Sequence, residues 1–270
     1  MSKSNKPLCA LTIAGSDSGG GAGIQADLKT FAAHGVHGLS AIAALTAQNT
    51  RGVSAVQVPP VGFLRAQIDA CFDDFRIGAV KIGMLANARV INAVVDALEF
   101  WRPDFVLLDP VMVASSGARL LQPGALAALR LRLIPLATVL TPNIPEAELL
   151  LGHAIAKDED AEAALVELLD LGAHAVLLKG GHLPGEEITD RLDDQRQLHE
   201  FVHPRLAVDG HGTGCTLAAA IAANICLGMG LAEACAAATD YVHGALLGAY
   251  EPGTGKLAVL DHFWRSPPHR

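Results

Sequence analysis

The sequence predicts an α/β protein in which a mainly parallel sheet carries helices on both of its faces. Short runs rich in Leu, Val and Ile alternate with longer helical patterns along most of the 270 residues, as in parallel strands joined by crossover helices. Hydrophobic residues make up 51% of the chain, enough to fill a large core, and no low-complexity linker divides it. We therefore expect one domain over residues 1–270, with a disordered Pro-rich tail at 266–270.

The individual elements follow from the local pattern: short β-branched or Leu-rich runs predict strands, and apolar residues every three or four positions predict helices. In chain order we expect strand Leu8–Ala14, helix Gln25–His34, strand Leu39–Leu45, helix Phe63–Phe75, strand Ala79–Ile82, helix Arg89–Trp101, strand Phe105–Leu108, helix Leu126–Leu133, strand Thr138–Leu140, helices Pro145–Leu151 and Asp160–Leu171, strand Ala175–Lys179, and helices Thr216–Cys226 and Leu231–Leu247. Polar alternating runs between Glu187 and His203, around Asp193-Asp194-Gln195, predict a small β-hairpin at the sheet edge.

Charge and composition exclude several functions. A formal net charge of −8 and an aromatic share of 4% argue against a nucleic-acid surface, which needs positive charge and stacking rings. The apolar run from Cys215 to Cys226 is much shorter than the roughly 20 residues that cross a membrane. Five cysteines without a CxxC pair are typical of reduced thiols. We therefore expect a cytoplasmic protein without nucleic-acid or membrane partners.

The segment GHGTGCTLAAAIAANIC, from Gly210, passes directly from a glycine-rich turn into an apolar helix. Unpaired amides and the positive end of such a helix bind anions, and the same field would favour a thiolate at Cys215. The alternative is a simple loop formed by Gly212 and Gly214 ahead of a core helix. Neither the Walker nor the dinucleotide fingerprint is present, so a nucleotide site here would be of another type.

A second glycine-rich segment, AGSDSGGGAGIQADLKT, follows the first predicted strand. Three consecutive glycines lose more conformational entropy on folding than an ordinary turn requires, so we expect another group to approach this backbone closely. The helix that follows carries Asp27, which could instead be a surface charge.

Polar side chains stand where other strands end. Asp109 and the segment Thr141–Glu146 each follow an apolar strand, and oxygen ligands gathered there suit Mg²⁺. Asn143 and Glu146 also have the spacing of a helix capping box, and both roles are compatible. Lys179 ends a strand before two glycines and could reach a nucleotide phosphate, although a solvated lysine is the alternative.

In the segment TAQNT, Gln48 offers a donor and an acceptor on one group, which matches a ring nitrogen beside an amino group on a heterocycle. Turn formation by Asn49 and Thr50 explains the same segment equally simply.

The segment His199-Glu200-Phe201-Val202-His203 matches the zinc motif HExxH. That motif needs a helix, which places residues i and i+4 on one face. Here Pro204 follows at once and the run reads as extended, which would separate the two histidines by about 13 Å. We therefore interpret the match as chance.

Seven segments occur together in one order: AGSDSGGGAGIQADLKTF, ALTAQNTRGV, KIGML, LDPVM, LTPNIPEAELLLG, LKGGH and HGTGCTLAAAIAA. From about Leu11 to Ala249 the chain thereby resembles the hydroxymethylpyrimidine and hydroxymethylpyrimidine-phosphate kinases of thiamin biosynthesis, a branch of the ribokinase-like family. The resemblance implies a ribokinase-like three-layer α/β/α sandwich, ATP and Mg²⁺ as cofactors, and a homodimer. It also implies transfer of phosphate to 4-amino-5-hydroxymethyl-2-methylpyrimidine and then to its monophosphate.

The resemblance assigns roles to individual residues. Gly15, Asp27, Gln48 and Met84 would surround the pyrimidine; Asn143, Glu146 and Asp109 would hold Mg²⁺, partly through water, and with Lys179 would bind the nucleotide; Gly212, Thr213 and Gly214 would form the anion hole. Cys215 stands where sugar kinases of the wider family carry a catalytic Asp, and we expect it to act as the base. Where relatives usually carry Asn-Thr before HGTGC, this chain has Val208-Asp209.

Two other functions stay open. Pyridoxal kinase is the nearest rival, since pyridoxal also presents a hydroxymethyl group on a nitrogen heterocycle. A non-catalytic pyrimidine sensor is the second, although the presence of Cys215, Asn143, Glu146 and Lys179 together argues against it.

Overall fold

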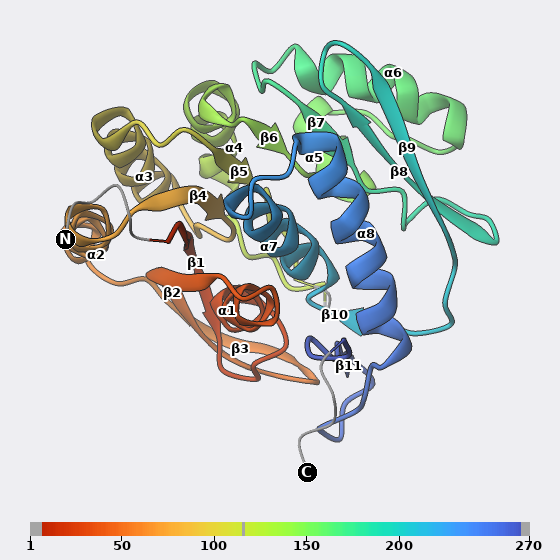
Figure 1. Ribbon diagram of the computed structural model, residues 1–270, viewed down its shortest axis with the longest axis horizontal. Coiled ribbons are helices and arrows are strands. Elements are labelled where there is room, and N and C mark those ends of the chain that lie inside the picture. Colours follow the sequence, from red (N-terminus) through yellow and green to blue (C-terminus); the bar gives the residue numbers. More distant parts are fainter. Residues whose placement is uncertain (1–6, 115–116, 266–270) are drawn as a thin grey trace.

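The computed structural model describes residues 7–114 and 117–265, so the tail expected to be disordered, 266–270, lies outside it. Within these residues a nine-stranded sheet of order β3-β2-β1-β4-β5-β6-β7-β8-β9 forms the middle layer (Figure 1). The strands are β1 (Cys9–Asp17), β2 (His37–Asn49), β3 (Gly52–Gln57), β4 (Ile77–Ile82), β5 (Val106–Leu108), β6 (Val139–Leu140), β7 (Val176–Leu178), β8 (Glu187–Asp193) and β9 (Leu198–Pro204). Neighbouring strands from β2 to β7 pair in parallel, whereas β3 at one edge and β8 and β9 at the other pair antiparallel.

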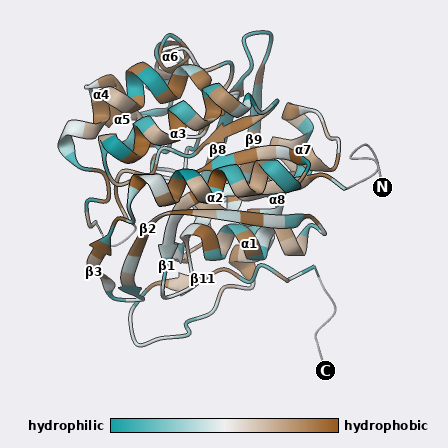
Figure 2. Cartoon of the chain, turned by 90° about the vertical axis from the view of Figure 1, so that its left-hand side faces the viewer, coloured by the Kyte–Doolittle hydropathy of each residue, from teal (hydrophilic) through white to brown (hydrophobic). Residues whose placement is uncertain are grey.

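Helices cover both faces of this sheet. They are α1 (Gly23–Ala33), α2 (Val61–Asp74), α3 (Ala88–Trp101), α4 (Leu126–Ala128), α5 (Ile144–Leu151), α6 (Asp158–Leu169), α7 (Thr213–Cys226) and α8 (Leu231–Leu247). Helices α2 to α6 pack on one face and α1, α7 and α8 on the other. In β1, Leu11 and Ile13 point into the first core while Ala10 points into the second, as strand alternation requires. The helices mix hydrophilic and hydrophobic residues along their length (Figure 2).

The predicted α/β/α sandwich and the edge hairpin are therefore confirmed, the hairpin as β8 and β9. None of the helices formed by the described residues is long and apolar enough to span a bilayer.

The edge next to β2 differs from the prediction. The segment Thr46–Asn49, expected as a loop after a strand, continues β2 and pairs with β3, a strand that the sequence analysis missed. Residues 54–57 of β3 are exposed, so this edge strand lacks the apolar run by which strands are recognised.

The helix expected at Leu126–Leu133 is also different. Only Leu126–Ala128 is α-helical; Leu129–Leu133 is a π-helical turn, with 3₁₀ turns before and after it. Pro135 explains the break, because it has no N–H to donate and its ring collides with the carbonyl four residues earlier.

A small second sheet holds the late glycine turn. Strand β10 (Gly210–His211) pairs in parallel with β11 (Ala258–Val259), neither of which was predicted. This pairing fixes the backbone that leads into α7, so the C-terminal segment supports the beginning of that helix.

Candidate active site

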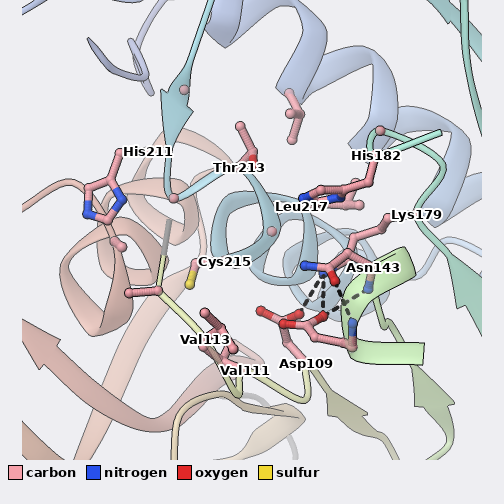
Figure 3. A pocket seen from close by; sticks show the side chains of 18 of the residues that line it. Asp109, Val111, Val113, Asn143, Lys179, His182, His211, Thr213, Cys215 and Leu217 are labelled. Carbon is pink, nitrogen blue, oxygen red and sulfur yellow. Dashed lines mark hydrogen bonds and ion pairs between the residues drawn. The ribbon is translucent and has the colours of Figure 1, made fainter. Parts of the chain in front are cut away.

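A cavity of about 590 Å³ lies at the carboxyl ends of the parallel strands. The start of α7 lines it, together with residues at or just after the ends of four of these strands: Asp17, Asp109, Asn143 and Lys179. In Figure 3, Cys215 lies between His211 on one side and the group formed by Asp109, Asn143 and Lys179 on the other. This is the edge at which open α/β sheets bind ligands.

The late glycine turn lies directly against the early one. Gly212 has φ of 83°, in the left-handed region, and a Cβ there would lie 2.0 Å from the carbonyl oxygen of Gly21. The close approach to the backbone expected at the segment AGSDSGGGAGIQADLKT is thus confirmed, and the approaching group is the other glycine segment.

The beginning of α7 faces the cavity with all four predicted anion-hole and catalytic residues. Gly212, Thr213, Gly214 and Cys215 line the cavity, and Gly212 is the N-cap, without a side chain to cap the helix. A Cβ on Gly214 would lie 3.0 Å from Nζ of Lys179, so glycine lets the helix end come close to this ammonium. Backbone N–H groups, the helix dipole and Lys179 together make this corner suited to a phosphate.

Cys215 is half-buried, and its thiol is less acidic than the sequence led us to expect. Burial raises the pKa of Cys215 to about 11, although the Lys81 ammonium and the N–H of Gly23 act in the opposite direction. The stabilised thiolate predicted from the helix field is therefore wrong for this environment, because loss of hydration outweighs the favourable charges. Cys215 is a neutral thiol near pH 7.

Asp27 does not line the cavity, and a direct contact between Asp27 and a substrate is a prediction that the structure corrects. Its carboxylate is fully buried, 2.9 Å from Nζ of Lys81, and accepts a hydrogen bond of 2.6 Å from the hydroxyl of Thr12. Burial alone would lower the pKa of Lys81, but Asp27 raises it above its ordinary value. Asp27 thus holds the cavity-lining Lys81 in its charged form.

Asp109 and Lys179 form a second buried ion pair. Nζ of Lys179 lies 2.9 Å from Oδ1 of Asp109 and 3.8 Å from Oε2 of Glu146. The other oxygen of Asp109, Oδ2, is buried and has no hydrogen-bond partner among the described residues. A buried carboxylate oxygen without a partner is costly, and it is available to a cation or a ligand.

Asn143 and Glu146 form the capping box at the start of α5. The side chain of Asn143 accepts from the N–H of Glu146, and that of Glu146 accepts from the N–H of Asn143. Burial raises the pKa of Glu146 to about 7, and the nearby Asp109 adds to the shift while Lys179 opposes it. The structural role is confirmed, and the carboxylate remains beside Lys179 and Asp109.

The opposite end of the cavity holds the residues expected around a heterocycle. A Cβ on Gly15 would lie 2.9 Å from Sδ of Met84, so glycine leaves room for this methionine against the strand. A register shift between Ala47 and Gln48 interrupts the pairing of β2 with β3, and such bulges redirect side chains. Gly15, Gln48 and Met84 all line the cavity, as predicted.

Several cavity residues were missed by the sequence analysis. They are Asp17, Lys81, Asp190 and His211, which are separated in the chain and meet only in the fold. Asp17 and His211 are each within a glycine segment that was singled out, but nothing in the sequence paired them.

His199 and His203 lie on strand β9 and not on a helix. His203 stacks on His243, with ring centroids 5.1 Å apart. Across residues 7–114 and 117–265, no group of three or more His, Cys, Asp and Glu side chains is arranged to hold a metal ion. The prediction that this run is extended and not helical is confirmed, so the two histidines do not have the one-turn helical spacing of HExxH.

The sandwich, the cavity at the strand ends and the glycine turn beside a thiol define a small-molecule phosphotransferase of the ribokinase-like class. The family model described as phosphomethylpyrimidine kinase matches residues 17–260, and the chain belongs to this family. The resemblance inferred from the sequence is thus confirmed.

Two relatives show how far the likeness extends. The chain is 52% identical over 260 residues to the hydroxymethylpyrimidine/phosphomethylpyrimidine kinase of Rhizobium meliloti strain 1021, covering 95% of this chain and 97% of the relative. The solved phosphomethylpyrimidine kinase of Clostridium difficile 630 has a TM-score of 0.79 and 44% identity, over 87% of this chain and 98% of that chain.

A pyridoxal kinase is also similar. The Staphylococcus aureus enzyme, solved in complex with AMP-PCP and pyridoxal, has a TM-score of 0.88 at 30% identity, over 97% of this chain and 96% of that chain. The fold is therefore shared between kinases of two different heterocycles.

The buried Asp27–Lys81 pair gives a stability prediction. We expect Asp27→Asn to lower the free energy of unfolding by roughly 3–5 kcal/mol, because it leaves the Lys81 ammonium buried without a counter-charge. Urea unfolding monitored by circular dichroism measures the change. The double variant Asp27→Leu with Lys81→Met should recover much of the loss, whereas a loss below about 1 kcal/mol in the single variant would contradict the assignment.

Asp190 gives a pH prediction. It accepts from the N–H of Gly180 at 2.9 Å, and burial raises its pKa to about 6, despite that bond and the nearby Lys179. Because the folded-state pKa is the higher one, the contribution of Asp190 to stability is present below about pH 4 and is lost as the pH rises through 6. Asp190→Asn should therefore become more stable than the wild type above pH 6, by less than roughly 3 kcal/mol. Urea unfolding of both proteins at pH 4, 6 and 8 tests this, and a pH-independent difference would contradict it.

Proposed function

We propose that the protein uses ATP to phosphorylate 4-amino-5-hydroxymethyl-2-methylpyrimidine and then the resulting monophosphate, in thiamin biosynthesis. The observation that carries the proposal is that the beginning of α7, Cys215 and Gln48 line one cavity in a chain of this family. The first offers an anion site, the second a proton acceptor, and the third a donor and acceptor for the pyrimidine edge.

The chain's own residues would carry the transfer as follows. The thiol of Cys215 first loses its proton to solvent, and the resulting thiolate takes the proton of the substrate's hydroxymethyl group. The freed oxygen attacks the γ-phosphorus of ATP, and the bond from that phosphorus to the bridging oxygen breaks to release ADP. The N–H groups of Gly214 and Cys215 would hold the transferring phosphoryl group, which is where preorganised dipoles contribute most. Lys81, held charged by Asp27, favours the ionised form of the sulfur.

The carboxylates in the cavity suit a magnesium ion that is also bound to the phosphates of a nucleotide. Mg²⁺ commonly takes one or two carboxylates, with water and substrate phosphates completing its shell. The buried Oδ2 of Asp109 without a partner is one such oxygen, and Glu146 supplies a second carboxylate near it. When bound, the ion would neutralise charge on the phosphates, while Lys179 holds the position of Asp109 and contacts the nucleotide. The N–H of Asn143 donates to the Glu146 carboxylate in the capping box and so orients it.

The role of Cys215 can be tested by substitution. We expect Cys215→Ala to lose about 10²- to 10⁴-fold in kcat with a modest change in KM, the range typical of a lost general base. Because the pKa of Cys215 is about 11, wild-type kcat should also rise with pH from 7 to 9, by up to about tenfold per unit, and the alanine variant should lack this rise. Steady-state kinetics at saturating ATP and Mg²⁺ measure both, and an unchanged kcat in the variant would remove Cys215 from the reaction.

Pyridoxal phosphorylation is the second candidate, favoured by the likeness to the S. aureus pyridoxal kinase. We expect kcat/KM for the aminopyrimidine to exceed that for pyridoxal, because Gln48 matches an amino group beside a ring nitrogen. Gln48→Ala should lower this ratio by about tenfold or more, since the paired hydrogen bonds are lost. Parallel assays with product analysis distinguish the mono- from the diphosphate, and a higher kcat/KM for pyridoxal in the wild type would reverse the ranking.

The same assay addresses the sensor alternative, because a sensor would bind the pyrimidine without releasing ADP. We further propose a cytoplasmic homodimer. The location is supported by the five cysteines, which form no disulfide with one another in the described part of the chain, and the dimer by the family resemblance.

A further inference from the structure

The side chain of Gln48 lies between two polar neighbours. Its Nε2 is placed 3.0 Å from Nε2 of His211, and its Oε1 is 3.2 Å from the hydroxyl of Thr46. Each neighbour can form a hydrogen bond with only one end of the amide. The positions of the hydrogen atoms around Gln48 can therefore be assigned from these hydrogen bonds.

The contact with Asp17 determines whether Nε2 of His211 carries a hydrogen. Oδ2 of Asp17 lies 3.1 Å from Nε2 of His211, and the same carboxylate accepts from the N–H groups of Gly19, Gly21 and Ala22. Burial raises the pKa of Asp17, but hydrogen bonds from His211 and the backbone outweigh it, so the pKa lies below its ordinary value. An ionised carboxylate can only accept, and Nε2 of His211 must therefore carry a hydrogen. A protonated Nε2 has no lone pair to accept from an NH₂ group, and its one hydrogen, shared between Asp17 and Gln48, is compatible only with an oxygen on the Gln48 side.

The hydroxyl of Thr46 leads to the same conclusion. Its one hydrogen is within reach of the carbonyl oxygen of Ser16, at 2.9 Å, and of Oε1 of Gln48, at 3.2 Å. The Ser16 carbonyl is nearer and can only accept, so the hydrogen goes to Ser16. Toward Gln48 the hydroxyl can then only accept, which requires the NH₂ group of the amide. Two independent neighbours thus favour the same orientation, with Oε1 toward His211 and Nε2 toward Thr46.

We propose that His211 is a positioning residue that fixes the orientation of the Gln48 amide, and with it the direction in which the substrate ring lies. The inference rests on the proposed recognition of the pyrimidine by Gln48. In this orientation the free lone pair of Oε1 receives the exocyclic amino group on the His211 side, and the free N–H of Nε2 reaches the ring nitrogen on the Thr46 side.

The positions of the amino and hydroxymethyl groups on the pyrimidine ring determine what this amide orientation means for the reacting group. On the ring, the carbon bearing the amino group lies between the ring nitrogen and the carbon bearing the hydroxymethyl group. An amino group on the His211 side therefore turns the hydroxymethyl group toward the turn at Gly212, which directly follows His211 in the chain. The opposite amide orientation would turn the reacting oxygen away from Cys215.

The backbone of Gln48 is held separately from its side chain. The hydroxyl of Ser18 donates to the Gln48 carbonyl at 2.7 Å and accepts from the Gln48 N–H at 2.8 Å. Loss of the His211 donor should therefore weaken the preference for this amide orientation without moving the strand. His211→Phe is a suitable variant, because a ring is retained where the imidazole packs on Gly21.

The test is a double-mutant cycle between His211→Phe and Gln48→Ala, with kinetics at saturating ATP and Mg²⁺. We expect His211→Phe to raise KM for the aminopyrimidine about tenfold and to lower kcat, while KM for ATP stays within twofold. In the Gln48→Ala background, His211→Phe should have less than a twofold further effect. With 5-hydroxymethyl-2-methylpyrimidine, which lacks the amino group, the effect of His211→Phe should also fall to about twofold.

Three controls complete the experiment. His211→Gln keeps an N–H donor and should recover kcat/KM to within about threefold of wild type. His174→Phe, at an exposed site, should leave the kinetics unchanged. If His211→Phe does not fold, Thr46→Val removes the other restriction on the amide and should show the same dependence on the amino group.

The outcomes separate the two claims. Additive effects in the cycle, or an equal loss with both pyrimidines, would overturn the positioning role while leaving recognition by Gln48 intact. Unchanged kinetics in Gln48→Ala alone would overturn the recognition and the positioning role together.

Discussion

The whole site depends on one close contact between two glycine-rich segments that are distant in the sequence. The carbonyl of Gly21 lies where a side chain on Gly212 would have to be, so the two backbones touch. Asp17 holds the first segment through its backbone N–H groups and contacts His211 of the second. This contact places the heterocycle end of the cavity next to the start of α7, and a transfer between two ligands requires that proximity.

The cavity wall carries basic side chains although the chain as a whole is acidic. The net charge is −8, yet the wall near Cys215 holds two buried ammonium groups, Lys81 and Lys179. Each is paired with a carboxylate, Lys81 with Asp27 and Lys179 with Asp109. Together with the N–H groups and dipole of α7, these ammonium groups give the corner donors for a phosphate, an arrangement that a count of charges along the sequence does not reveal.

Local pattern predicted the order of strands and helices and the edge hairpin, because buried strands and amphipathic helices leave a period in the sequence. The prediction failed where the local conformation depends on tertiary structure or on a single residue. Strand β3 is exposed and has no apolar run, and Pro135 breaks a helix whose apolar spacing is otherwise regular. For the site, the motifs predicted which residues line the cavity, but not that Asp27 serves Lys81 or that His211 meets Gln48. Those pairings bring together residues 54 and 163 positions apart, and no local rule relates them.

The acidity of Cys215 suggests why a thiol suits this position where the wider family is expected to carry an aspartate. Asp27 and Asp109 both raise the pKa of Cys215, which shows that the site already holds negative charge near the sulfur. A carboxylate there would add a third permanent negative charge, beside a phosphoryl group that is itself negative, in a place where burial makes each charge costly. A thiol is neutral near pH 7, so the anion hole keeps its positive potential while the phosphate binds, and the sulfur acts as a base only after its own proton has passed to solvent. The same burial makes the thiolate, once formed, a strong base, and the site thereby separates the binding of an anion from the removal of a proton.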